Sequence, residues 1–241
     1  MSIQVGKIYQ QVLLLTKDTR NVQLTPEKFN LIAETAQLQV FEKIFHDYKL
    51  ALRKVNSQED VGDELSLLEE KIAPFRVFNA TVQVNSGNGT LIPVTGQTIY
   101  DLLRVHEANG TQDLEQVTRE NFNYILRGSG VIKLTPAFGQ KIFYRRGPAA
   151  IQIAPADNTD LKFDYIRKPS RPRFATSPSS PTMNQGTIFE GSNSAQFDLH
   201  ASDTSALLNT ILELVGMMKN DGLVIQTAGK IKATNEVNKD R

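Results

Sequence analysis

The sequence contains no cysteine and no tryptophan. Without cysteine there can be no disulfide bond, no cysteine-ligated metal and no thiol nucleophile. The sequence also lacks a long apolar run, so no membrane-spanning helix is expected. Its first residues, MSIQVGKIYQQVLLL, lack the basic segment, apolar core and small-residue cleavage site of a signal peptide. These absences predict a protein that folds inside a cell, or in a particle assembled there.

The charge is nearly balanced overall but unevenly distributed along the chain. The 241 residues include 27 basic and 26 acidic side chains, for a net charge of +1. Residues 131–181 hold 9 basic and 3 acidic side chains, and the rest of the chain is slightly acidic. A proline-rich tract, YIRKPSRPRFATSPSSPTMNQG (residues 165–186), lies within this basic region. A nucleic-acid-binding domain usually carries more positive charge than this, concentrated on one face.

The periodicity of apolar residues predicts an α+β fold in four regions. These are an N-terminal helical bundle (1–74), a β-rich region with a short helix (75–167), an extended Pro/Ser-rich connection (168–198), and a C-terminal helical region with a tail (199–241). Helices are expected at about 3–17, 26–55, 59–72, 118–127, 204–219 and 223–235. Strands of a small antiparallel β region are expected at 75–84, 91–94, 141–146, 149–155, 161–168 and 196–199, and in a hairpin turning at Asn109-Gly110.

Helix starts are marked by capping residues. Thr25 can cap the second helix and Pro26 suits its first position. Thr118 can cap the short helix, and Ser202 or Asp203 the helix at 204–219.

The second helix has an unusually wide apolar surface. No glycine or proline interrupts roughly 29 residues, or about 43 Å. One apolar stripe contains Phe29, Ile32, Ala33, Ala36 and Val40, and a second, spaced by seven, contains Leu31, Leu38, Phe45 and Leu52. A surface helix needs a single stripe somewhat wider than 100°. The helix is therefore either central in its own bundle or also buried by another chain. In the second case both stripes are buried in an assembly, and one stays exposed in an isolated subunit.

No pattern indicates catalysis. His46, His106 and His200 lie in different predicted elements, and none has a second ligand at metal spacing. The glycine-containing stretches SGNGT and TAGK lack the spacing of a phosphate-binding loop. Paired acids such as Glu69-Glu70 fit a solvated helix face. We therefore expect no enzyme activity, no cofactor and no metal.

The proline-rich tract allows three interpretations. As an electrostatic arm, it would offer phosphates four basic residues, Arg167, Lys168, Arg171 and Arg173, with one aromatic neighbour, Phe174. As an extended segment, its four prolines hold the backbone in polyproline or β geometry. As a third possibility it is a disordered loop. The second interpretation predicts that residues 168–190 lie extended and contact an adjacent subunit through these basic residues and Phe174. Deleting residues 170–188 would then leave the subunit folded and weaken assembly.

Two stretches carry a family resemblance. VLLLTKDTRNVQLTPEKFNLIAETAQLQVFEKIFHDYKLALRK resembles the opening of virion proteins from crAss-like and related tailed phages. The matching residues are Thr25, Pro26, Phe29, Asn30, Ala36, Gln37, Phe41, Phe45 and Tyr48. IQIAP followed by DYIRKPSRPRF resembles the middle of those proteins. The family often has tryptophan after the second proline, where this chain has Arg173-Phe174.

The resemblance implies a structural protein of the phage head-to-tail connector or tail. Such a protein forms a homo-oligomeric ring of about twelve copies around the DNA channel. Its partners would be the portal and other tail or ring proteins, with DNA passing through without sequence recognition and no membrane involved. The expected location is the virion, after assembly in the host cytoplasm. The alternative is a nucleic-acid-binding protein that uses the basic region 131–181.

Overall fold

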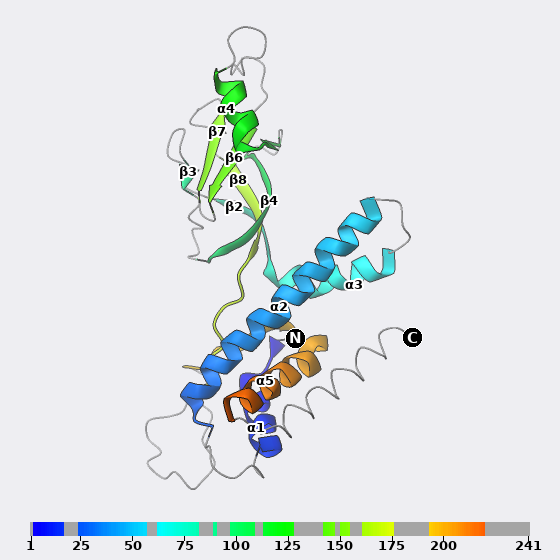
Figure 1. The fold of residues 1–241 in the computed structure, drawn as a ribbon, viewed down its shortest axis with the longest axis vertical. Helices are drawn as coiled ribbons and strands as arrows, with labels where there is room; N and C mark the ends of the chain where they lie inside the picture. The colour runs from blue at the N-terminus through cyan, green and yellow to red at the C-terminus, as the bar shows by residue number, and fades with distance from the viewer. Residues whose placement is uncertain are drawn as a thin grey trace. The chain divides into compact units, whose positions relative to one another are not determined.

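A computed structural model describes residues 2–16, 24–56, 62–81, 89–90, 97–108, 113–127, 142–147, 150–154, 161–175 and 193–219. These residues form helices and small β-sheets, so the predicted α+β class is confirmed (Figure 1). The chain divides into two compact units. Unit 1 contains Met1–Pro74 and Pro169–Arg241, and unit 2 contains Phe75–Lys168. The first and last regions expected from the sequence thus belong to a single unit.

Unit 1 is a helical bundle with one very short sheet. Its elements are β1 (Ser2–Ile3), α1 (Val5–Thr16), α2 (Pro26–Asn56), α3 (Gly62–Ile72), β9 (Phe197–His200), the 3₁₀ turn η4 (Ala201–Asp203) and α5 (Thr204–Lys219). Strands β1 and β9 pair antiparallel, and α2 packs against both α3 and α5. The turn η1 (Ala73–Phe75) ends the N-terminal helical segment.

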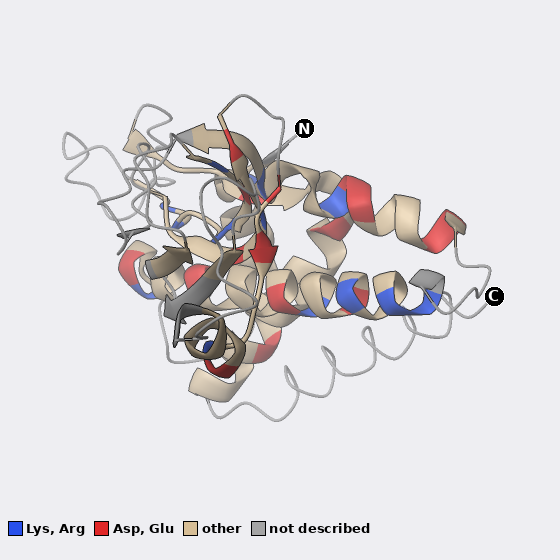
Figure 2. Ribbon diagram, turned by 90° about the horizontal axis from the view of Figure 1, so that it is seen from above, with Lys and Arg blue, Asp and Glu red and all other residues tan. Residues whose placement is uncertain are grey.

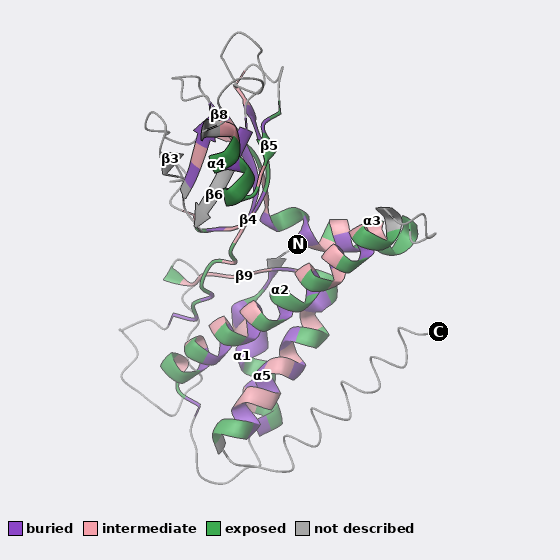
Figure 3. Cartoon of the chain, turned by 45° about the horizontal axis from the view of Figure 1, so that its top comes forward, coloured by how far each residue is buried: buried purple, intermediate pink, exposed green. Residues whose placement is uncertain are grey.

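The long helix α2 begins where its capping residues predict. The Phe29 N–H donates to the Thr25 carbonyl at 2.9 Å, and the Lys28 N–H lies 3.4 Å from Thr25 Oγ1. Glu27 in the first turn and two basic residues in the last turn suit the helix dipole. Along one side of the helix, the first apolar stripe is entirely buried (Figure 3). Helix α2 packs against α5, whose buried residues are Leu207, Asn209, Ile211, Leu212, Val215 and Gly216.

An ion pair joins α3 to the turn before α5. Lys71 Nζ lies 2.6 Å from Asp203 Oδ1, and the two side chains are only 15% and 6% exposed. Asp203 was one of two predicted caps for α5, but its Oδ1 binds Lys71. In η4 itself, the His200 side chain accepts the Ser202 N–H.

Unit 2 contains two sheets that share a core. In one sheet β8 (Leu161–Arg167) lies between β2 (Arg76–Thr81) and β4 (Ile99–Glu107). The other has the order β3-β7-β6-β5, with bounds Gly89–Thr90, Ala150–Ala154, Ile142–Gly147 and Glu115–Gln116. The shared core includes Leu102, Val105, Leu114, Phe143, Ile151, Phe163 and Tyr165. The predicted strands at 75–84, 141–146, 149–155 and 161–168 thus correspond to β2, β6, β7 and β8.

A buried carboxylate shapes the three-stranded sheet. Asp164, on the central strand β8, accepts the Asn79 N–H at 2.8 Å. Both neighbouring strands have an irregular register beside it, between Val77 and Ala80 in β2 and between Leu102 and Arg104 in β4. Asn79 has a φ of 53°, in the left-handed region that asparagine tolerates better than most residues. The bulge in β2 therefore gives the carboxylate a backbone donor.

The short helix α4 (Arg119–Arg127) follows a cap at Thr118, as predicted. The Asn121 N–H lies 3.4 Å from Thr118 Oγ1, and Phe122 N–H donates to the Thr118 carbonyl. Phe122 is buried with Ile142 and Ala154 in a small separate cluster.

Several expectations need correction. The predicted hairpin is only partly formed, because Asp113 bridges His106 of β4 and the chain then leaves to pair β5 in parallel with β6. In α1, Val5, Ile8 and Val12 are buried, whereas Leu15 is 59% exposed. The strand at 91–94, the turn at Asn109-Gly110 and the helix at 223–235 lie outside the described residues.

Candidate interaction surface

The proline-rich tract enters unit 1 as a strap, residues 169–175, that lies along α2. Among the described residues of the tract after Arg167, no helix or strand is formed except one isolated bridge between Arg173 and Ala195. Residues 168–175 thus match the prediction of a segment without regular structure. Residues 176–190 of that prediction lie outside the described residues.

Gln37 of α2 ties the strap to β9. Its Nε2 donates to the Ser170 carbonyl at 2.6 Å, and its Oε1 accepts the Asp198 N–H at 2.9 Å. Asp198 Oδ2 in turn accepts from both the N–H and the hydroxyl of Ser170, at 2.8 and 2.6 Å. Gln37 is 1% exposed, so its hydrogen bonds are made where water cannot replace them.

Asn30, seven residues before Gln37 on the same side of α2, holds the other end of the strap. Asn30 Nδ2 donates to the Phe174 carbonyl at 3.1 Å, and Asn30 Oδ1 accepts the Phe174 N–H at 2.7 Å. An amide side chain thereby pairs with the backbone as a neighbouring strand would. We call Asn30, Gln37, Ser170, Phe174 and Asp198 the clasp.

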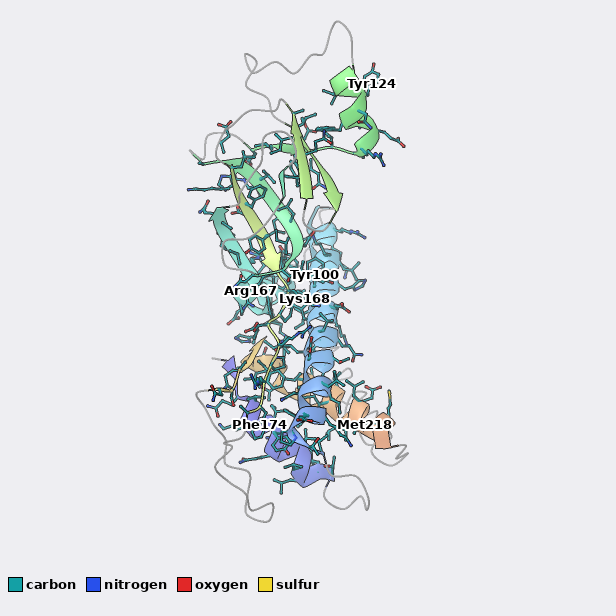
Figure 4. The ribbon with its side chains drawn as sticks, turned by 90° about the vertical axis from the view of Figure 1, so that its left-hand side faces the viewer. Tyr100, Tyr124, Arg167, Lys168, Phe174 and Met218 are labelled. Carbon is teal, nitrogen blue, oxygen red and sulfur yellow. The ribbon has the colours of Figure 1, made fainter. Side chains whose placement is uncertain are left out.

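The Phe174 ring enters the core beneath the clasp. It stacks on Tyr9 with a centroid distance of 4.4 Å and meets Phe29 edge-on at 6.4 Å. It is 3% exposed, and its position is labelled in Figure 4. The Tyr9 hydroxyl donates to the Leu24 carbonyl at 3.0 Å, and burial raises its pKa.

Two residues of the strap that were expected to contact an adjacent subunit have partners within their own chain. Phe174 was expected to anchor on an adjacent subunit, but an aromatic ring that fills a pocket of its own chain is not available to a partner. Arg171 was likewise expected to contact an adjacent subunit. Its Nε instead lies 2.8 Å from Glu34 Oε1 of the same chain. Arg171 is 83% exposed, so this pair stabilises the strap by at most about 1 kcal/mol.

Of the other basic residues proposed for this surface, Arg167 and Lys168 belong to unit 2 and Arg173 to unit 1. Arg167 lies in β8, with its guanidinium carbon 5.5 Å from the centroid of the Phe75 ring. Lys168 is exposed, and its N–H donates to the Thr98 carbonyl at 2.8 Å. Arg173 is exposed and exchanges two backbone hydrogen bonds with Ala195.

The second stripe of α2 is only partly free in the single chain. Leu31 is 69% exposed, whereas Leu38, Phe45 and Leu52 are half-buried. The Phe45 ring stacks on Phe41 at 6.2 Å. Helix α3 packs against α2. Within this stripe, the exposed side chain is therefore that of Leu31, at the start of the helix.

The three histidines make contacts that are typical of structural residues. His46 is exposed beside Asp47, and His200 caps η4. His106 is buried, with Nδ1 donating to the Glu107 carbonyl at 3.0 Å and Nε2 lying 3.8 Å from Asp164 Oδ1. Within the described ranges, no group of three or more histidine and acidic side chains is placed to hold a metal ion.

Sequence reasoning missed the role of Asn30 and Gln37. Both lie on the buried side of α2 among apolar residues, seven positions apart. A buried amide needs a hydrogen-bond partner. That polar pair on an apolar face was the signal that another segment crosses the helix there.

Comparison of the sequence with protein-family models gives no match, and comparison with curated proteins gives none either. Among the residues that the structure describes, no helix has both the length and the apolar character to cross a membrane.

Proposed function

We propose that this chain is a structural protein of a tailed-phage virion, related to those of crAss-like phages. It forms a ring in the head-to-tail connector or tail and joins the portal to tail components around the DNA channel. It has no catalytic role.

One observation carries the proposal. The two stretches that resemble the phage proteins, residues 12–54 and 151–174, are far apart in sequence, yet they meet in the clasp. Asn30 and Gln37 come from the first stretch, and Ser170 and Phe174 from the second. Their contact supports the view that the two resemblances reflect one structural element rather than two chance matches.

The clasp also suits a mechanical role. Three hydrogen bonds from two buried or half-buried amides fix the strap's backbone, a fourth joins Gln37 to Asp198 of β9, and a buried aromatic ring anchors the strap. The chain that leaves unit 2 at Lys168 is thus fastened within seven residues. A subunit of a connector must keep its parts joined while DNA passes, and fastening of this kind serves that need.

DNA would pass without sequence recognition. Acidic and basic positions are interspersed along the described helices and strands (Figure 2). Arg171 is paired with Glu34, and Arg167 lies over an aromatic ring. Binding to phosphates should therefore be weak and strongly dependent on salt.

The test is the assembly state of the full chain, measured by analytical ultracentrifugation and negative-stain electron microscopy, with and without duplex DNA. We expect closed rings of one size without DNA, and no change in mass when DNA is added at physiological salt. A chain that stays monomeric at all concentrations contradicts the proposal. A monomer that binds DNA tightly at that salt would instead support a nucleic-acid-binding protein.

A further inference from the structure

Unit 2 is inserted into unit 1 through two chain crossings. The chain leaves unit 1 between Pro74 and Phe75 and returns between Lys168 and Pro169. Each crossing therefore has a proline on its unit 1 side. Proline has no backbone N–H, so it cannot donate a further hydrogen bond to a strand ladder. The two prolines thus limit how far β2 and β8 can extend beyond unit 2.

The first and last residues of unit 2 lie side by side. In the antiparallel pair of β2 and β8, Arg76 is the partner of Ile166. The guanidinium carbon of Arg167 lies 5.5 Å from the centroid of the Phe75 ring. A domain whose two ends are adjacent can be inserted into a loop of a host domain without separating the two parts of the host. Unit 2 has this property.

Unit 2 also has its own sheets and its own hydrophobic core. Both of its sheets are built from strands of unit 2, whereas β1 and β9 of unit 1 pair with each other. Its core includes the buried side chains of Val105, Phe143, Ile151 and Phe163. Residues 75–168 exceed the length of many domains that fold alone. Unit 2 therefore has the features of a separate cooperative folding unit.

On the unit 1 side, both crossings are anchored to one short segment, which contains β9 and η4. Before the first crossing, Lys71 Nζ lies 2.6 Å from Asp203 Oδ1, and we call this pair the first anchor. After the second crossing, the N–H and the hydroxyl of Ser170 donate to Asp198 Oδ2 at 2.8 and 2.6 Å, and we call this pair the second anchor. Gln37 of α2 reinforces the second anchor, because it binds the Ser170 carbonyl and the Asp198 N–H.

Both anchors lie close to the crossings that they follow or precede. Lys71 lies three residues before Pro74, and Ser170 directly follows Pro169. The side chains of the first anchor are only 15% and 6% exposed, so water competes poorly for their charges. If unit 2 unfolds, the loss of structure can therefore spread along the chain into unit 1 only after an anchor has broken.

We infer that unit 2 is an inserted domain that opens and refolds while unit 1 stays folded, and that the two anchors form the barrier between the two folding units. The arrangement is a conformational device, since a loss of structure in unit 2 stops at the two crossings. The inference goes beyond the proposed function and does not depend on ring assembly, because every contact that carries it lies within one chain.

Hydrogen exchange of the full-length protein, followed by mass spectrometry, tests the independence of the two units. Phe163→Leu loosens the core of unit 2 and Ile211→Ala that of unit 1, because both side chains are fully buried. We expect Phe163→Leu to speed exchange of the β4 and β8 amides at least about tenfold and that of the α2 and α5 amides less than about twofold. Ile211→Ala should have the reverse effect. Equal acceleration in both units by either variant overturns the inference.

A larger substitution in unit 2 gives a result even when that unit no longer folds. Phe163→Ala leaves a cavity in the core of unit 2 and should unfold much or all of it. Slow exchange of the α2 and α5 amides in this variant supports the inference. Loss of protection in both units means that the chain unfolds as one body, and this outcome overturns it.

A second comparison tests the anchors. Asp198→Ala removes the carboxylate that holds Ser170, and Glu42→Ala, at an exposed position of α2, is the matched control. Each substitution is combined with Phe163→Ala. We expect the α2 and α5 amides of the Asp198→Ala combination to exchange at least about tenfold faster than the product of the two single effects predicts, with no such excess for Glu42→Ala. If the single effects simply multiply in both combinations, the second anchor is not a barrier, and the inference is wrong.

Discussion

Asn30 forms two hydrogen bonds with the backbone of a single residue, Phe174, which lies 144 positions later in the chain. Its amide nitrogen donates to the Phe174 carbonyl, and its amide oxygen accepts the Phe174 N–H. A side chain on a helix thus satisfies both backbone groups of a residue in a segment that has few hydrogen-bond partners of its own. The arrangement fixes the direction of the strap and positions the Phe174 ring over Tyr9.

The first prediction concerns that ring. Phe174→Ala should lower the free energy of unfolding of unit 1 by about 3–5 kcal/mol, because it leaves a cavity between Tyr9 and Phe29. Phe78→Ala is the control, since Phe78 is 62% exposed and should cost less than about 0.5 kcal/mol. Urea denaturation followed by circular dichroism measures both values. Equal values for the two variants would show that the ring does not anchor the strap.

The second prediction tests the side-chain amide of Gln37 in the clasp by comparison with a nearby glutamine on the same helix, Gln39. Gln37→Glu removes the donor to the Ser170 carbonyl and places a buried carboxylate against it, so it should cost about 2–3 kcal/mol. Gln39→Glu adds the same charge to the exposed face of the same helix and should have almost no effect. A thermal-melting comparison of the two variants distinguishes loss of the hydrogen bond from addition of charge. A Gln37→Glu variant as stable as Gln39→Glu would contradict the clasp.

Features that depend on residues close together in the sequence were predicted, and features that depend on residues far apart in the sequence were not. The helices α2, α4 and α5 and the strands β6, β7 and β8 were predicted close to their observed bounds, because periodicity and capping act between near neighbours. The packing of the strap along α2 of its own chain was not predicted. A proline-rich segment has no apolar period, and Asn30 and Gln37 recognise its backbone, which is the same for every sequence. The parallel pairing of β5 was missed for a related reason, since a turn signal specifies where the chain reverses and not which strand it joins next.

The third prediction concerns the ion pair between α3 and η4. Lys71→Met leaves the carboxylate of Asp203 buried without its partner, and should cost about 3 kcal/mol. The double variant Lys71→Met/Asp203→Asn removes the charge as well and should recover at least about 1 kcal/mol of that loss. A double-mutant cycle of urea unfolding measures the coupling. Strictly additive costs would mean that the two groups do not interact, despite their separation of 2.6 Å.

The fourth prediction tests the bulge in β2. Asn79→Ala should destabilise unit 2 by about 1 kcal/mol, because alanine tolerates a φ of 53° poorly. Asn79→Gly should be close to neutral, since glycine adopts this conformation freely and retains the N–H that Asp164 accepts. Hydrogen exchange of the β8 amides reports the stability of this sheet. An alanine variant as stable as the glycine variant would show that the positive φ is not required there.

The last prediction uses the pH dependence of the Tyr9 hydroxyl. Burial raises its pKa above the ordinary value of 10, so the neutral phenol is favoured in the folded state. For a group with a raised folded pKa, the stabilisation is complete below the unfolded pKa and is lost as pH rises through the folded pKa. Unit 1 should therefore lose stability steadily above about pH 10.

In the Tyr9→Phe variant, the free energy of unfolding should fall less steeply as pH rises above about 10. The difference in slope should correspond to about one proton. That variant should also be less stable at neutral pH by about 0.5–1.5 kcal/mol, because it lacks the hydrogen bond to the Leu24 carbonyl. Tyr124→Phe is the control, as Tyr124 is 73% exposed. Urea unfolding across the alkaline range, with tyrosinate absorbance recorded in parallel, compares the three proteins. If the free energy of unfolding has the same alkaline pH dependence in wild type and in Tyr9→Phe, the Tyr9 hydroxyl reaches solvent when it ionises. The packing of Phe174 on Tyr9 would then not keep water away from that hydroxyl.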